Sequence, residues 1–181
     1  MLLAGCLALG PWQADVVQNW GFNSGAVLDG EFWRFLTSHF AHASWEHLGM
    51  NALGLVLLQQ LFGRELKGVV VLWAYGVIAF GIGLCILGFG GRGTYIGLSG
   101  MLHGLFALGA CLALKRDVLV AAGVLIVIVG KVFWEQVDGA SSFVEQLIGS
   151  PVAIDAHLYG LGAGVLFGVA LTATALRRPG E

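Results

Sequence analysis

Five long stretches of this chain contain at most one charged residue each, and this feature limits most strongly how the chain can fold. They cover residues 45–62, 67–88, 95–114, 118–134 and 153–176. About 20 mostly apolar residues are enough to cross a bilayer as a helix. Over the whole chain 11% of residues are charged and 57% are hydrophobic, whereas soluble domains carry about 25% charge. The sequence therefore predicts an all-α, polytopic membrane protein and excludes a water-soluble globular enzyme, a disordered tail and a collagen.

A sixth helix is predicted over residues 1–20, which gives six transmembrane helices in a single domain over residues 1–181. This first helix is short unless it continues past Pro11 to Trp20, where an interfacial end is expected. A cleaved signal peptide is the alternative, although the basic residues that open such peptides are missing. We also expect the native start codon to lie upstream of Met1.

Basic residues are distributed unevenly between the predicted loops. If the helices alternate in direction, one side of the membrane holds Arg64, Lys67, Lys115, Arg116, Arg177 and Arg178. The other side holds fewer basic residues and most of the acidic ones, in the segments 10–44, 88–94 and 135–152 and around Asp155. Cytoplasmic loops carry an excess of Lys and Arg. This distribution predicts that both termini are cytoplasmic and that the second set of loops lies outside.

The few strongly polar residues within the predicted helices are expected to share one depth. His47, Asn51, Ser99 and His157 all follow closely after the outer end of a helix, which places them roughly 5–10 Å below that end at a rise of 1.5 Å per residue. Polar groups inside a membrane are costly and are therefore functional candidates. His47 and Asn51 are spaced i,i+4 and share one face of their helix.

Glycines provide a reason for two of these helices to meet. Gly160, Gly164 and Gly168 continue the stripe that begins at His157, and Gly100 and Gly104 lie beside the stripe of Ser99. Small residues at this spacing let helix backbones approach closely in lipid. We therefore expect the Ser99 hydroxyl to lie within reach of the His157 imidazole.

A serine beside a histidine is the nucleophile and base pair of acyl transfer. Histidine is the usual base near neutral pH, and preorganised donors must stabilise the oxyanion that develops. The available donors are His47, the Asn51 amide and the backbone N–H of Ser99. Gly97 and Gly100 remove bulk around the hydroxyl and allow a tight turn into the helix. Asp155 is either a partner that orients His157 or a loop-side or substrate-contact residue.

These motifs together resemble the rhomboid family of intramembrane serine proteases over about residues 30–170. The matching segments are 31–34 (EFWR, with Trp33 and Arg34), His42 with 47–51 (HLGMN), 97–100 (GLSG) and 156–160 (AHLYG) followed by Gly164. The resemblance implies a six-helix rhomboid-like bundle with Ser99 as nucleophile and His157 as base. It also implies an oxyanion hole made of His47, Asn51 and the Ser99 amide.

One departure from the family pattern is informative. Where many members carry a tyrosine four residues after the serine, this chain has His103. The chain resembles the rhombosortase subgroup in this histidine, in its compact size, and in the segments 134–136 (WEQ) and 155–160. That resemblance implies a bacterial inner-membrane enzyme acting on secreted proteins with a Gly-Gly motif, an apolar helix and a basic tail, by hydrolysis or by transfer of the acyl chain to an amine. His103 would pack on His157, tune its basicity or carry a second proton.

Several other residues have simpler interpretations. His39 and His42 are expected to be solvated or to brace their loop, with a water-retaining or oxyanion-side role as the alternative for His42. Trp33 and Arg34 are expected to brace the outer loop or to act as interfacial anchors. Lys131 is expected to snorkel or to pair with Glu135. The three cysteines are interpreted as buried hydrophobic residues: Cys6, Cys85 and Cys111.

No cofactor is expected. No metal is expected either, since the sequence contains no HExxH motif. A site with three nitrogen ligands would have to combine His42, His47 and one of His103 or His157. The net charge of −2 provides no basic surface for nucleic acid. The expected partners are the lipid bilayer and a membrane-anchored protein substrate with a C-terminal transmembrane tail, and the chain is expected to be a monomer. The alternatives are a catalytically inactive rhomboid-like chaperone or adaptor, and a small transporter.

Overall fold

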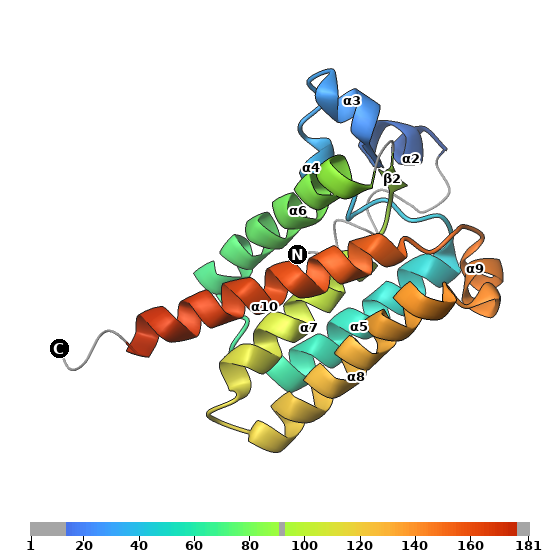
Figure 1. Cartoon of the computed structure of the whole chain (residues 1–181). Helices are drawn as coiled ribbons and strands as arrows, with labels where there is room; N and C mark the ends of the chain where they lie inside the picture. The colour runs from blue at the N-terminus through green and yellow to red at the C-terminus, as the bar shows by residue number, and fades with distance from the viewer. Residues whose placement is uncertain (1–13, 91–92, 177–181) are drawn as a thin grey trace.

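The computed structural model describes residues 14–90 and 93–176, and five long helices dominate them (Figure 1). The long helices are α5 (Trp45–Phe62), α6 (Val69–Phe89), α7 (Ser99–Ala113), α8 (Val118–Asp138) and α10 (Ile154–Leu176). Short elements fill the connections: α2 (Ala14–Trp20), β1 (Phe22–Asn23), α3 (Ser24–Leu28), α4 (Arg34–Thr37), β2 (Thr94–Tyr95) and α9 (Ser142–Ile148). The all-helical prediction is confirmed for these residues, apart from one two-stranded ribbon.

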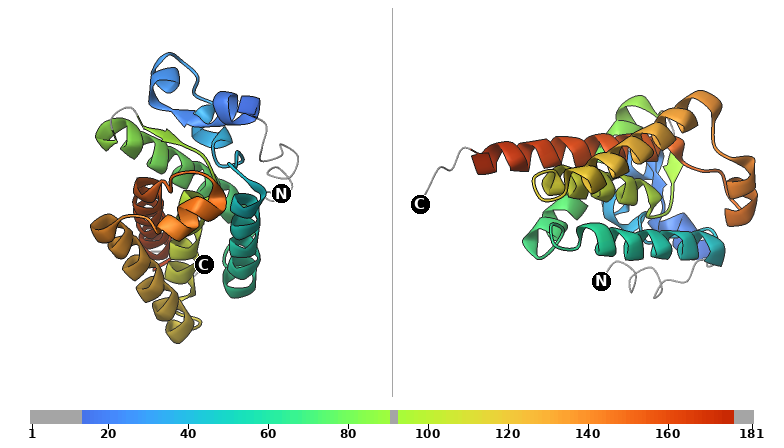
Figure 2. Two further views of the ribbon diagram at one scale, coloured as in Figure 1. Left: turned by 90° about the vertical axis from the view of Figure 1, so that its right-hand side faces the viewer. Right: turned by 90° about the horizontal axis from the view of Figure 1, so that it is seen from below.

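Helix α7 is the centre of the bundle. It packs against α5, α6, α8 and α10, and twelve of its fifteen residues are buried. The views in Figure 2 show α7 between α5 on one side and α10 on the other, with α8 beside α10. The surrounding helices expose large apolar side chains on their outer faces, among them Leu72, Trp73, Ile126, Val127 and Leu166. An apolar outer surface of this kind is suited to lipid.

Glycines bring α10 into direct backbone contact with α7. A Cβ atom on Gly160 would collide with the carbonyl oxygen of Gly100, and one on Gly164 with that of Gly104. In the opposite direction, a Cβ on Gly104 would lie 2.6 Å from the carbonyl oxygen of Gly160. The close approach predicted from the glycine spacing is therefore confirmed, and no larger residue fits at these positions without moving a backbone.

The start of α7 differs from the prediction. The sequence predicted a helix from residue 95, but Thr94 and Tyr95 form β2, which pairs antiparallel with β1. Pairing with a distant segment cannot be seen in the local pattern of apolar residues. Ser99 is therefore the first residue of its helix rather than one lying below its end, and the predicted depth is wrong for this residue.

Helix α8 also ends later than predicted, at Asp138 instead of residue 134. The consequence is that Glu135, which the prediction assigned to the outer loop, belongs to the last turns of a helix. The match is otherwise close: α5 begins and ends as predicted, and α6 and α10 shift by two residues or fewer at each end.

Three helices of the described residues are long and apolar enough to cross a membrane: Val69–Phe89, Val118–Asp138 and Ile154–Thr174. Helix α7 is apolar but shorter, and α5 carries His47 and Asn51 among its buried residues. Of the first predicted helix, residues 1–13 lie outside the described residues, and α2 follows them. The count of six spans therefore remains a prediction.

The α7–α10 contact can be tested with two glycines of the same helix. Gly164→Ala places a methyl group against Gly104, whose Cα would lie 2.7 Å away, whereas a Cβ on Gly162 meets nothing within 4 Å. Overpacking of this kind costs about 1–3 kcal/mol. We expect Gly164→Ala to lower the free energy of unfolding by about that amount in detergent micelles, measured by reversible denaturation. Gly162→Ala is the control, and an equal loss in both variants would contradict the backbone contact.

Candidate active site

Ser99 and His157 come together where α7 and α10 begin. The hydroxyl Oγ of Ser99 lies 2.9 Å from Nε2 of His157. The glycine contact extends up to this pair, because a Cβ on Gly100 would lie 2.8 Å from the carbonyl oxygen of Ala156. The residues that adjoin Ser99 and His157 are thus in backbone contact, which sets the separation of the two side chains.

The other ring nitrogen of His157 is bound by Glu135, which the sequence suggested as a partner of Lys131 but not as a residue of the site. Nδ1 of His157 lies 2.8 Å from Oε2 of Glu135, whose Oε1 lies 2.6 Å from Nζ of Lys131. An ionised carboxylate only accepts hydrogen bonds, so Nδ1 carries the proton and Nε2 presents its lone pair to the Ser99 hydroxyl. The predicted Lys131–Glu135 pair is confirmed.

Glu135 is therefore the carboxylate beside His157, a place for which the sequence suggested Asp155. The side chain of Asp155 is exposed, and the bond to Nδ1 of His157 comes from Glu135 instead. Glu135 was missed because the predicted helix stopped one residue before it. The i,i+4 spacing from Lys131 was the available signal that this helix continues.

His103 stacks on the face of His157. The ring centroids are 4.1 Å apart with 16° between the planes, and Nδ1 of His103 lies 2.7 Å from the backbone oxygen of Ser99. A carbonyl oxygen accepts, so Nδ1 of His103 is a donor and fixes the ring over its partner. This geometry supports the packing role among the three that were predicted.

On the other side of Ser99 lie His47 and Asn51 of α5. Nδ1 of His47 accepts a hydrogen bond of 3.4 Å from the backbone N–H of Ala43, so its Nε2 carries the proton in the neutral ring. Gly97 has a φ of 106°, and a Cβ there would lie 2.6 Å from Nε2 of His47. Nδ2 of Asn51 is buried without a hydrogen-bond partner in the described part of the chain. Two side-chain donors therefore remain available beside Ser99.

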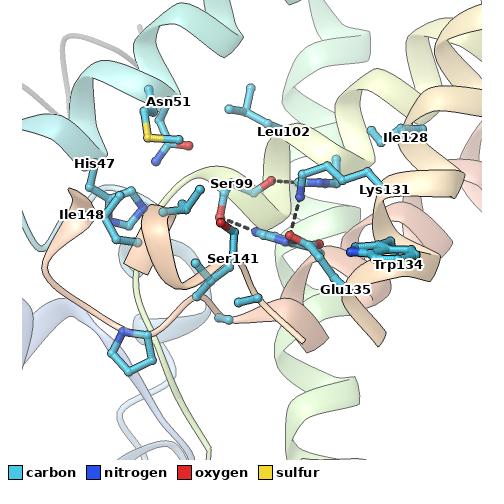
Figure 3. A pocket seen from close by; sticks show the side chains of 18 of the residues that line it. His47, Asn51, Ser99, Leu102, Ile128, Lys131, Trp134, Glu135, Ser141 and Ile148 are labelled. Carbon is cyan, nitrogen blue, oxygen red and sulfur yellow. Dashed lines mark hydrogen bonds and ion pairs between the residues drawn. The ribbon is translucent and has the colours of Figure 1, made fainter. Parts of the chain in front are cut away.

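These side chains line one pocket of about 930 Å³ (Figure 3). Its wall is formed by all the long helices except α6, by α9 and by the segment 139–142. Most of the lining is apolar, including Leu102, Ile128 and Ile148, and the polar groups gather around Ser99. An apolar cavity with a few convergent polar groups is the usual form of a binding site.

A series of buried hydrogen bonds holds Gly97 in place. The hydroxyl of Tyr95 donates to the carbonyl oxygen of Gly97, so its oxygen accepts from Nδ1 of His39, 2.6 Å away. The N–H of Gly97 donates to the carbonyl oxygen of Ser38 at 2.9 Å. Burial lowers the pKa of His39 to about 4, although backbone hydrogen bonds partly oppose this, and burial raises the pKa of Tyr95. Both groups are therefore neutral at physiological pH.

The predicted bracing residues of the outer loop are found in that role. Arg34 is buried, and it binds Glu31 and the carbonyl oxygens of Gln18 and Gly21 at 2.6–2.8 Å. Nε1 of Trp33 donates to the carbonyl oxygen of Asn19.

His42 is also buried, which contradicts a solvated histidine and agrees with loop bracing. Its Nδ1 donates to the carbonyl oxygen of Phe40 at 3.0 Å, and its ring meets that of His47 edge to face. Burial lowers the pKa of His42 as well.

One group of potential metal ligands occurs among the described residues, and it is not the group that the sequence suggested. The ligand atoms of His103, Glu135 and His157 lie within 4.8 Å of one another. The lone pair of an imidazole nitrogen lies in the plane of its ring, so two parallel stacked rings cannot both direct a lone pair at one ion. The geometry therefore fits stacking and hydrogen bonding better than metal coordination.

The fold and the site define a helical membrane protein with a serine–histidine pair in an apolar pocket. The rhomboid domain family matches residues 29–174, so the chain belongs to the rhomboid family. The chain is also 29% identical over 155 residues to a Bacillus subtilis (strain 168) protein named "Putative rhomboid protease YdcA", an alignment that covers 81% of this chain and 70% of the relative. Family and relative both support a protease.

The buried state of His39 predicts a stability that depends on pH. Since the pKa of His39 is lowered to about 4, the unfolded chain binds a proton below about pH 6.5 while the folded chain does not. The contribution of neutral His39 to the free energy of unfolding is therefore fully present above about pH 6.5 and is lost as the pH falls toward 4. At pH 5 the loss is on the order of 2 kcal/mol. Thermal unfolding in detergent at pH 7.5 and pH 5 measures this, and His39→Gln should reduce the difference. A difference that is the same in both proteins would contradict the assignment.

Proposed function

We propose that this protein is an intramembrane serine endopeptidase in which Ser99 is the nucleophile and His157 the general base. The observation that carries the proposal is the 2.9 Å contact between Oγ of Ser99 and the unprotonated Nε2 of His157, at the wall of the pocket. A nucleophile and base within hydrogen-bond reach, with the base oriented by a third group, is the signature of covalent catalysis.

The proposed reaction follows from the placement of the donors. Oγ of Ser99 attacks the scissile carbonyl carbon while its proton passes to Nε2 of His157. The oxyanion is bound by Nε2–H of His47, the Asn51 amide and the backbone N–H of Ser99, which has no intrahelical acceptor in the first turn of α7. His157 then protonates the leaving amine, and water or an amine releases the acyl group from Ser99.

The substrate is proposed to be a secreted or surface protein with a C-terminal transmembrane tail, as in rhombosortases. His103 in place of the family's tyrosine supports this subgroup, as do the segment 134–136 and the compact size. The pocket is bordered by small residues over the segment 139–142, which leaves space for a chain near Ser99. The mass of the released product distinguishes hydrolysis from transfer to an amine.

The proposed location is the bacterial inner membrane, with both termini in the cytoplasm and the pocket open to the periplasm. The distribution of basic residues supports this orientation. Ser99 and His157 begin their helices at the same end of the bundle, so water from one side of the membrane has a short path to the site. The chain is proposed to act as a monomer.

The first prediction of this proposal concerns the two reacting side chains. Ser99→Ala and His157→Ala should each abolish cleavage of a membrane reporter that ends in a Gly-Gly motif, an apolar helix and a basic tail. The measurement is the appearance of the shortened reporter in membranes containing equal amounts of each variant. Cleavage that persists in both variants would refute the mechanism, and association of the reporter with an inactive wild type would favour an adaptor.

A second prediction concerns the oxyanion donor Asn51. Removing one such donor typically lowers the rate about 10²–10³-fold. Asn51→Ala should therefore lower kcat by that factor and leave KM nearly unchanged, because the donor acts on the transition state. Gln60→Ala, an exposed site on the same helix, is the matched control. An Asn51→Ala variant with unchanged kcat would reject this role.

A further inference from the structure

We propose that Glu135 is a positioning residue for His157, so that the site works as a serine–histidine–glutamate triad. The inference rests on the proposed function and adds a third member to it, supplied by α8. The three members come from three different helices: Ser99 opens α7, His157 lies in the first turn of α10, and Glu135 lies in the last turns of α8.

The ring of His157 is held on three sides. Glu135 accepts from Nδ1 at 2.8 Å, Ser99 lies 2.9 Å from Nε2, and His103 covers one face. The side chain of His157 is only 4% exposed, so solvent is a poor substitute for any of these partners. Stacking by His103 restricts the plane of the ring but does not select a tautomer. The carboxylate of Glu135 does, because it requires the proton on Nδ1 and thereby leaves Nε2 free to act as base.

The surroundings of Glu135 suit an ionised carboxylate. A charged group within a membrane-spanning helix is costly unless it is paired. Each oxygen of Glu135 has its own partner, Oε1 with Lys131 and Oε2 with His157. The Lys131 side chain is 48% exposed while the Glu135 side chain is 12% exposed, so Lys131 extends toward the surface and pairs there with a largely buried acid. The pair allows a negative charge to persist beside the imidazole.

In the reaction, the negative charge of Glu135 stabilises His157 once the imidazole has taken up a proton and become positive. The proton of Ser99 moves to Nε2, the Nδ1 proton stays on the ring, and Glu135 remains ionised while it stabilises the imidazolium. No proton passes to the carboxylate. In the comparable triad of serine proteases, replacement of the acid by its amide lowers kcat about 10⁴-fold with the geometry intact.

The test measures how fast Ser99 reacts with a fluorophosphonate probe, because this requires no knowledge of the native substrate. The full-length protein is reconstituted in lipid nanodiscs, and the maximal labelling rate and the half-saturating probe concentration are determined separately. We expect Glu135→Gln to lower the maximal rate about 10²–10⁴-fold with little change in the half-saturating concentration. Glu135→Asp, which keeps the charge, should recover part of the rate. Asp29→Asn, which alters an exposed carboxyl that does not line the pocket, should label like wild type.

One further variant and a comparison of melting temperatures separate the possible causes of a lower labelling rate. The double variant K131M/E135Q removes the lysine whose charge would otherwise be left near His157, and it should be as slow as E135Q. Recovery of the double variant to the wild-type rate would overturn the inference, as would an E135Q variant that labels normally while Ser99→Ala and His157→Ala do not label. Equal losses in E135Q and E135D, together with a lowered melting temperature in both, would indicate a structural role only and would also overturn it. A wild type that does not label would instead contradict the proposed function itself.

Discussion

The backbone contact between α7 and α10 determines the rest of this structure. Without side chains at Gly100, Gly104, Gly160 and Gly164, the two helices approach until carbonyl oxygens of one lie against Cα atoms of the other. In lipid, where apolar side chains gain little by leaving the solvent, such close packing is a main source of helix association. Because Ser99 adjoins this contact and His157 precedes it by one turn, the same glycines that hold the bundle together also set the distance between the two reacting atoms.

Each polar group around this contact has a fixed protonation state and a fixed orientation. Glu135 fixes the proton of His157 on Nδ1, and the carbonyl oxygen of Ser99 does the same for His103. The hydroxyl of Tyr95 donates a hydrogen bond to the carbonyl oxygen of Gly97 and so fixes that residue. Such fixed orientation matters in an apolar pocket, where a hydrogen bond is stronger than in water and an unpaired polar group is costlier. Nδ2 of Asn51 has no hydrogen-bond partner within residues 14–90 and 93–176, which fits a donor to the negative charge that develops in the transition state.

Much of this arrangement could be predicted from the sequence, because its main determinants are local. Apolar length predicts the helices, and the glycine spacing predicts that the helices of Ser99 and His157 touch. What could not be predicted depends on contacts between distant segments. The pairing of Thr94 and Tyr95 with Phe22 and Asn23 turns the expected first helical turn into a strand. Glu135 was assigned to a loop because the apolar stretch that begins at residue 118 ends at residue 134. Only the approach of α8 to α10 shows that the Glu135 carboxylate reaches His157.

An experimental structure of the protein in lipid nanodiscs, with a fluorophosphonate bound, would show directly whether Ser99 is the nucleophile and whether His157 and Glu135 lie beside it. We expect a phosphonyl group attached to Oγ of Ser99, its oxygen facing the Asn51 amide and Nε2 of His47. We also expect His157 to lie between Ser99 and Glu135, with the backbones of α7 and α10 in contact at their glycines. A structure in which the adduct forms on another residue, or in which Ser99 and His157 face apart or into lipid, would contradict a serine–histidine pair as the reacting groups.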